Sequence, residues 1–205
     1  MLIKNKSDEL DFWFLELARS AAIINKNRLD YLQNLKQTLH SNQIKGLDTL
    51  VQSLEQFDFK FSTGWPKEVD GVDKQNIYQY LHKNTDNLLR TKYLNYGSHK
   101  ANIEFSLNKK NECFLSRGEQ KTLSIIFWLT QVAMLVSLKI KPIVLIDDLS
   151  SELDTIKINI VLKYLKALKI QTFMTDIGHN LSIINIVNPL VFKINQGDIK
   201  GEFNP

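Results

Sequence analysis

The chain has 205 residues, of which 43% are hydrophobic and 23% charged, a composition typical of a globular protein of one or two domains. Its 26 Lys and Arg against 22 Asp and Glu give a formal charge of +4, which permits a nucleic-acid partner without requiring one. The single Cys113 excludes a disulfide framework and favours a reducing, cytoplasmic compartment. The longest apolar stretch, Ile125 to Leu138, is shorter than the ~20 residues of a membrane-spanning helix, so no membrane partner is expected.

The first part of the chain, residues 1–92, is predicted to be mainly helical. Between residues 8 and 56 apolar residues recur every three or four positions, which indicates one long amphipathic helix or two helices separated at Gly46. Residues 57–61 alternate between apolar and polar side chains and predict a short strand. A further helix is expected from about Asp73 to Lys92.

The second part of the chain, residues 93–205, is predicted to alternate strands with helices, which indicates an α/β fold with a largely parallel sheet. The expected elements are a loop over 95–100, a strand over 103–107, a helix over 119–138, a strand over 143–147, a helix over 155–169, a strand over 172–175, a helix over 180–187 and a terminal hairpin over 190–199.

Two carboxylates follow the most apolar of these strands. The continuous apolar run 143–146 predicts a strand covered on both faces. Asp147 and Asp148 come where it ends, at the edge where α/β folds bind their ligands. In this setting one carboxylate can hold Mg²⁺ while the other faces an attacking water. The alternative for the short stretch taken alone is a strand that runs into a polar loop.

A second candidate site is the start of the apolar helix. Ser116 precedes Glu119 by three residues, the spacing of a capping box, and Gly118 between them allows a ligand to approach the backbone closely. The free amides and partial positive charge of a helix N-terminus bind anions. Taken alone, the pattern favours an ordinary capped helix, because capping boxes are common.

In their order and spacing, these stretches resemble the head of an ABC-type ATPase. Residues 115–119 resemble its signature motif, residues 143–148 its Walker B strand and residues 151–154 its D-loop. Within that superfamily, residues 96–101 and 147–154 are similar to two segments of the RecF family of DNA repair ATPases.

The resemblance to RecF covers nearly the whole chain and is densest over residues 96–154. It implies that residues 93–205 are the C-terminal half of an ABC/SMC-like ATPase head and that residues 1–92 are part of a helical arm. It also implies that Asp147 binds Mg²⁺ and that Asp148 is the catalytic residue that positions water. The residues implied to contact ATP are Ser116, Arg117, Gly118, Glu119 and Asp154.

The function implied by the resemblance is recombinational DNA repair, with roles in replication and the SOS response. The head would dimerise around ATP, bind gapped DNA or junctions of single- and double-stranded DNA, and help to load recombinase with a mediator such as RecR. Four lysines are candidates for phosphate contacts, although scattered lysines are also ordinary solvated surface: Lys92, Lys100, Lys109 and Lys110.

The chain departs from the family pattern at several positions. Ser98 replaces the usual proline, Glu119 stands where many signature motifs have Gln, and Asp148 is shorter than the Glu of many heads. Asp176 stands where many heads have a switch histidine, and His179 follows three residues later.

The largest departure is the absence of a glycine-rich phosphate loop. No glycine of the chain has the spacing G-x-x-x-x-G-K-[ST] whose amides cradle phosphates. The chain is therefore expected to lack ATPase activity by itself and to need the missing Walker A lobe as a partner. Two alternatives stay open: a non-enzymatic module that binds DNA or a protein, or part of another SMC-like or abortive-infection ATPase head.

Overall fold

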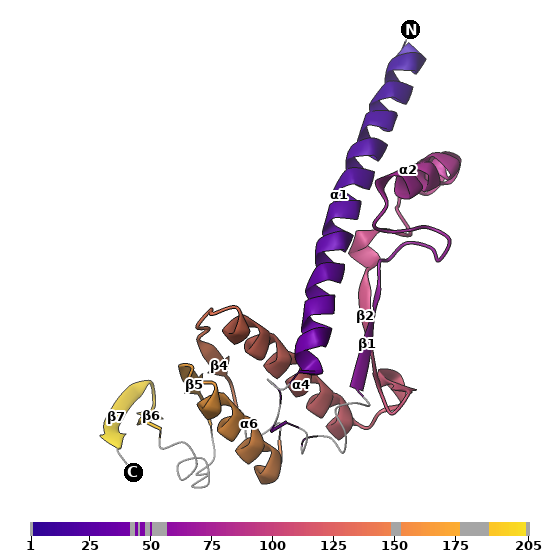
Figure 1. Cartoon of the computed structure of the whole chain (residues 1–205). Helices are drawn as coiled ribbons and strands as arrows, with labels where there is room; N and C mark the ends of the chain where they lie inside the picture. Colours follow the sequence, from indigo (N-terminus) through magenta and orange to yellow (C-terminus); the bar gives the residue numbers. More distant parts are fainter. Residues whose placement is uncertain are drawn as a thin grey trace. The chain divides into compact units, whose positions relative to one another are not determined.

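The computed structural model describes residues 2–41, 44, 46–47, 50, 57–148, 153–176 and 189–203 (Figure 1). The chain folds into two compact units. The first comprises Met1–Lys36 and Gln56–Phe114, and the second Gln37–Glu55 and Leu115–Pro205. These units are not the predicted arm and head, since residues 93–114 lie with the first unit. The division into arm and head at residue 92 stays a prediction. Across the described residues, no helix combines the length and the hydropathy needed to cross a membrane.

The first unit is built along one long helix, α1 (Leu2–Leu39), which Figure 1 shows as a single rod. Buried side chains recur along it at three- and four-residue steps, as the sequence pattern predicted. The buried α1 residues of the first unit include Phe14, Ala18, Ala21, Ala22, Leu32 and Leu35. The helix ends before Gly46, so this glycine does not interrupt it.

The helix expected over residues 73–92 is divided in two. Helix α2 (Lys74–Lys83) begins after Asp73, whose side chain accepts a hydrogen bond from the Gln75 amide at 2.7 Å. Helix α3 (Thr85–Thr91) follows a break at Asn84. The hydrophobic core of the unit contains Phe14, Ala18, Ala21, Ala22, Trp65, Ile77 and Leu81. Helix α2 therefore packs on α1 through its apolar face.

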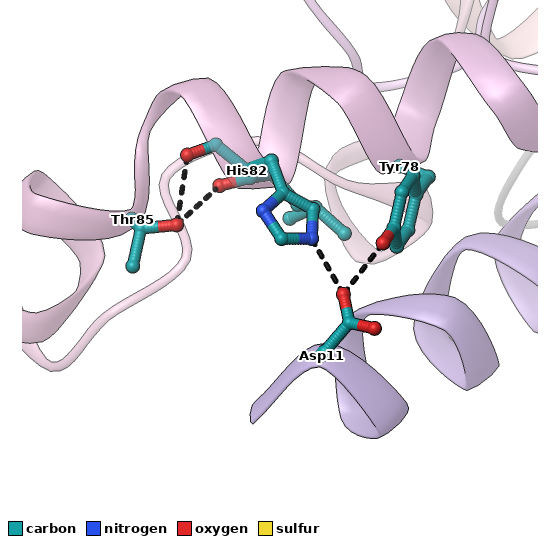
Figure 2. A network of polar contacts seen from close by, with 5 residues as sticks. Asp11, Tyr78, His82 and Thr85 are labelled. Carbon is teal, nitrogen blue, oxygen red and sulfur yellow. Dashed lines mark hydrogen bonds and ion pairs between the residues drawn. The ribbon is translucent and has the colours of Figure 1, made fainter. Parts of the chain in front are cut away.

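A polar contact also joins α1 to α2, as Figure 2 shows. The Tyr78 hydroxyl donates to Asp11 Oδ1 at 2.5 Å, and His82 Nε2 lies 2.6 Å from the same oxygen. These hydrogen bonds lower the pKa of the Asp11 carboxyl, with the larger contribution from Tyr78 and the next from His82. The bond to Asp11 raises the pKa of the Tyr78 hydroxyl, because the neutral phenol is the donor. Asp11 is therefore an ionised acceptor at neutral pH.

Asn25 of α1 is fully buried and fixes the loop that follows the first strand. Its Nδ2 donates to the Gly71 carbonyl at 2.8 Å and to the Thr63 carbonyl at 3.2 Å. We predict that Asn25→Leu, which keeps the volume and removes the donor, lowers the free energy of unfolding by about 2–4 kcal/mol, because two carbonyls lose their partner. Urea denaturation measures the loss. Asn27→Leu, at an exposed position of the same helix, is the control and should change stability by less than about 0.5 kcal/mol. Equal losses for the two variants would contradict the prediction.

An antiparallel sheet completes the first unit. Its strands are β1 (Phe57–Ser62), β2 (Asn102–Leu107) and β3 (Lys110–Asn111), in the order β1-β2-β3. Phe59 lies opposite Phe105, and the rings of Phe57 and Phe105 stack with centroids 6.1 Å apart. Lys36 Nζ of α1 lies 2.5 Å from Asp58 Oδ1 and joins the helix to β1. The strands expected over 57–61 and 103–107 are thus confirmed.

The second unit contains the predicted alternation of helices and strands. Its described elements are α4 (Arg117–Ser137), β4 (Val144–Ile146), α6 (Thr155–Ala167), β5 (Thr172–Met174), β6 (Val191–Asn195) and β7 (Asp198–Phe203). Strands β4 and β5 pair in parallel, with Leu145 opposite Phe173, and β6 and β7 form the predicted terminal hairpin. The helix expected over 180–187 lies outside the described residues. An α/β fold with parallel pairing is therefore present.

One face of the parallel pair is exposed, which corrects the prediction of a strand covered on both faces. Val144 is buried, whereas Ile143, Leu145 and Phe173 are 62%, 73% and 53% exposed. Leu145 and Phe173 are register partners and point to the same face. Parallel sheets are normally covered on both faces, so these apolar side chains form a surface that the described part of the chain leaves open.

Candidate functional site

The carboxylates predicted to act on a nucleotide lie at the ends of the two parallel strands. Asp147 and Asp148 follow β4, and Thr175 follows β5. The Thr175 amide donates to the Ile146 carbonyl at 2.9 Å, and its hydroxyl donates to Asp147 Oδ1. The same hydroxyl oxygen accepts the Asp148 amide at 3.0 Å. Thr175 therefore holds both aspartates at the carboxyl edge of the sheet.

Thr175 was missed as a site residue in the sequence, although its position gave a signal. It is the last residue of the short strand predicted over 172–175 in a largely parallel sheet, and it directly precedes Asp176, the residue in the place of the switch histidine. Asp176 is exposed at the same edge. His179 lies outside the described residues.

Asp148 has a left-handed backbone conformation, with φ of 50°. This conformation costs a residue with a side chain about 1–2 kcal/mol, and Asp tolerates it better than most. The hydrogen bond from its amide to the Thr175 hydroxyl helps to hold it there.

The donor set at this edge fits a Mg²⁺ ion that a nucleotide helps to bind. Among the residues that the structure describes, no group of three or more His, Cys, Asp or Glu could hold a metal. Mg²⁺ at nucleotide sites needs fewer protein ligands, since one or two carboxylates are completed by phosphate oxygens and water. The exposed Asp147 carboxylate and the Thr175 hydroxyl are oxygen donors of this kind.

The turn at residues 115–119 forms the predicted capping box at the start of α4. Ser116 Oγ accepts the Glu119 amide at 3.3 Å, and Glu119 Oε2 accepts the Ser116 amide at 2.8 Å. Ser116, Arg117, Gly118 and Glu119 are all exposed. A side chain added at Gly118 would meet nothing within 4 Å. The N-terminus of α4 is therefore open to a partner.

The Glu119 carboxylate also accepts a hydrogen bond from the hydroxyl of the N-cap residue Ser116. Ser116 Oγ donates to Glu119 Oε2 at 2.7 Å, so the carboxylate accepts both the amide and the hydroxyl of Ser116. A glutamine at this position could cap the helix equally and also donate a hydrogen bond to a phosphate, which an ionised glutamate cannot. The nucleotide contact predicted for Glu119 stays a prediction.

Asp154 is the N-cap of α6 and is coupled to α4. Its Oδ1 accepts the Lys157 amide at 2.9 Å, and this hydrogen bond is the main reason that the pKa of Asp154 is lowered. Lys157 Nζ donates to Thr122 Oγ1 of α4 at 3.1 Å and lies 3.6 Å from Asp154 Oδ2. Ser151 and Glu152 of the predicted D-loop lie outside the described residues. Its last residue is thus tied through Lys157 to the helix that carries the signature-like turn.

These features follow the order expected for the C-terminal half of an ABC-type ATPase head: a capped helix, then a strand that ends in two carboxylates, then a capped helix and a parallel partner strand. Compared with family models, the chain matches none. It is 31% identical to the DNA replication and repair protein RecF of Pseudoalteromonas translucida, over 96% of this chain and 52% of that protein. It is also 31% identical to RecF of Lactobacillus johnsonii, over 93% of this chain and 51% of that protein.

Solved structures show the same fold. The structure described as the recombination mediator protein RecF with ATP in the RecFOR pathway aligns with 96% of this chain and 50% of its own, with a TM-score of 0.69 and 21% identity. The chain spans about half the length of the curated relatives that it matches. The predicted resemblance to the C-terminal portion of RecF is therefore confirmed.

Proposed function

We propose that the chain is the C-terminal half of a RecF-type ATPase that binds DNA in recombinational repair and dimerises around ATP. The observation that carries this proposal is the cluster of Asp147, Asp148 and Thr175 at the carboxyl edge of a parallel strand pair, in a chain similar to RecF over 96% of its length. In this proposal the chain contributes the groups that act on the ATP phosphates, and a separate lobe with the glycine-rich loop binds the ATP.

In this proposal the aspartates serve the nucleotide of their own subunit. Asp147, oriented by the Thr175 hydroxyl, would hold Mg²⁺, which supplies charge neutralisation at the β- and γ-phosphate oxygens when bound. The Asp148 carboxylate would accept a hydrogen bond from the attacking water and orient it toward the γ-phosphate. Thr175 contributes by holding the Asp148 backbone in its left-handed conformation.

The signature-like turn serves the nucleotide of the other subunit. The free amides at the start of α4 and the exposed Arg117 side chain provide donors for a γ-phosphate, and Gly118 leaves room for it. Ser116 and Glu119 shape the turn. Lys157 contacts both Asp154 and α4, so the end of the D-loop is linked to the helix that begins at this turn.

The missing lobe would pack on the open face of the parallel pair. That lobe carries the glycine-rich loop, and the face offers Ile143, Leu145 and Phe173 as an apolar contact surface. Since the relatives are about twice as long as the chain, they contain enough additional polypeptide to cover it.

The remaining parts of the proposal extend what the relatives' names state. Those names support DNA replication and repair, and a pathway of recombination mediators, as the context of the chain. Within that context we propose gapped or junction DNA as the ligand, a mediator such as RecR as a partner, a role in the SOS response and a cytoplasmic location. A non-enzymatic DNA- or partner-binding module is the second candidate, because the 205 residues contain no phosphate loop.

The test is a chimaera that joins the N-terminal half of the Pseudoalteromonas translucida RecF to this chain. We expect the chain alone to show neither ATP binding nor hydrolysis, because its sequence contains no phosphate loop. We expect the chimaera to show both. Equilibrium dialysis with labelled ATP and phosphate release are the measurements. Turnover by the chain alone would contradict the proposal. A folded chimaera that binds no ATP would favour the non-enzymatic module.

A further inference from the structure

A group of exposed aromatic and basic side chains has no role in the site described above. It lies on residues 93–100, here called the Tyr93–Lys100 loop. Tyr93 is 53% and Tyr96 46% exposed, and His99 and Lys100 are exposed as well. Aromatic side chains that are half in solvent beside cations are a common feature of surfaces that bind nucleic acids.

The backbone of this loop is held in one place. The Gly97 amide donates to the Gly64 carbonyl at 2.8 Å. Gly64 has φ of +80°, and a Cβ on it would lie 2.2 Å from the Gly97 carbonyl oxygen, so the close approach requires glycine. Arg28 Nη1 of α1 donates to the Ser98 carbonyl at 2.6 Å, and Ser98 Oγ donates to the Ala21 carbonyl at 3.3 Å. The serine that replaces the usual proline therefore anchors the loop to α1.

The Tyr96 ring packs on the core, and the Tyr93 ring lies beside a cation. Tyr96 meets the Tyr80 ring edge-on at 6.2 Å between centroids, and Tyr80 meets the buried Trp65 edge-on at 5.8 Å. Tyr96 is thus the outermost of three rings that start in the core. Lys100 Nζ lies 5.8 Å from the centroid of the Tyr93 ring, a cation–π distance. A ring packed as Tyr96 is loses little conformational freedom when a ligand stacks on it.

The charge around the rings is positive. Between Arg90 and Lys100 the sequence contains Arg90, Lys92, His99 and Lys100 and no acidic residue. Lys92 is exposed at the end of α3. Burial first, then Tyr96 and Glu68, raises the pKa of the Tyr80 hydroxyl, which lies beneath Tyr96. Cations beside two exposed aromatic rings suit a ligand that offers phosphates and flat bases together.

We propose that the Tyr93–Lys100 loop binds an unpaired stretch of DNA, with the rings of Tyr93 and Tyr96 stacking on bases and Lys92 and Lys100 contacting phosphates. The bases of a duplex are already stacked on one another, so two exposed rings fit a single strand. The inference rests on the proposed function, because it assigns to particular residues the single-stranded part of a gap or junction.

The test uses the full chain and a fluorescein-labelled oligothymidine of about 15 nucleotides in an anisotropy titration. Base stacking on an aromatic ring is strong enough that Tyr93→Leu with Tyr96→Leu should weaken binding about tenfold or more. Tyr93→Phe with Tyr96→Phe keeps both rings and should bind within about twofold of the native chain. Tyr31→Leu, at an exposed tyrosine of α1, is the matched control and should have no effect. Lys100→Gln should reduce the slope of log affinity against log salt by about 0.7, the contribution of one phosphate contact of a single strand.

Photocrosslinking of the native chain to the same oligonucleotide carrying 5-iododeoxyuridine needs no variant, and cross-links at Tyr93 or Tyr96 are expected. Cross-links elsewhere, equal binding by the native chain and a folded Leu variant, or no binding of the oligonucleotide would each overturn the proposal. Equal losses for the single strand and for a duplex of the same length would overturn base stacking. The proposed ATPase function is read from nucleotide binding by the chimaera, so the two can fail separately.

Discussion

In the chimaera that restores the phosphate loop, Asp148→Asn is expected to lower the rate of ATP hydrolysis by about 10²–10³-fold and to leave the affinity for ATP within about threefold. The loss follows from the role of the carboxylate: an amide cannot accept the proton of the attacking water, and removing a positioned base costs rate factors of this size. Asparagine has the same shape and tolerates the left-handed conformation of residue 148, so the fold should not change. Phosphate release measures hydrolysis, and equilibrium dialysis measures binding.

Two further variants make this result specific. Asp147→Asn should instead weaken the Mg²⁺-dependent part of ATP binding, because residue 147 is proposed to hold the metal. Asp198→Asn, at an exposed position in the terminal hairpin of the same unit, should change neither property. Unchanged hydrolysis by a folded Asp148→Asn chimaera would remove Asp148 from the catalytic role.

The second large effect is expected at Gly118. Gly118→Ala should raise the stability of the chimaera by up to about 1 kcal/mol, because alanine favours the helix and its methyl group meets nothing within 4 Å. The same methyl group should lower hydrolysis by about tenfold or more, since it holds the γ-phosphate of the opposite subunit away from the start of α4 and a misplacement of about 1 Å can cost 10²-fold. Ser124→Ala, also exposed on α4, is the control for helix propensity and should leave hydrolysis unchanged.

Mixing the two impaired chimaeras decides whether the turn acts across the dimer. In a mixed dimer of Asp148→Asn and Gly118→Ala subunits, one composite site carries both changes and the other carries neither. Random pairing makes about half of the dimers mixed, each with one intact site out of two, so about a quarter of the native activity should return. If each subunit used its own turn, no activity would return, and the proposed arrangement would be wrong.

The parts of this fold that depend on neighbouring residues could be predicted from the sequence. Ser116 and Glu119 stand three residues apart, and their capping box formed as expected because its geometry is local. Asp147 and Asp148 were expected at a strand end and lie there. The break at Asn84 was not predicted, because residues 73–92 contain no proline or glycine to mark it.

What the sequence did not predict depends on pairing between distant segments. The Thr175 hydroxyl lies next to Asp147 and Asp148 only because β4 and β5 are neighbours, and the position of Thr175 at a strand end does not reveal which strand is that neighbour. The exposure of Leu145 has a different cause. An apolar run shows that a strand is suited to be covered, but not whether the covering segment belongs to the same chain.

The capping box of α4 has a consequence for how a signature-like turn meets its nucleotide. With Glu119 accepting both the amide and the hydroxyl of Ser116, the chain's own carboxylate already stands among the donors that an incoming phosphate would use. In the proposed dimer the turn would thus carry an internal competitor, and closure would exchange one anion for another rather than fill an empty site. The free energy gained would be the difference between two sets of hydrogen bonds, which would make closure weaker and easier to reverse than the number of contacts suggests.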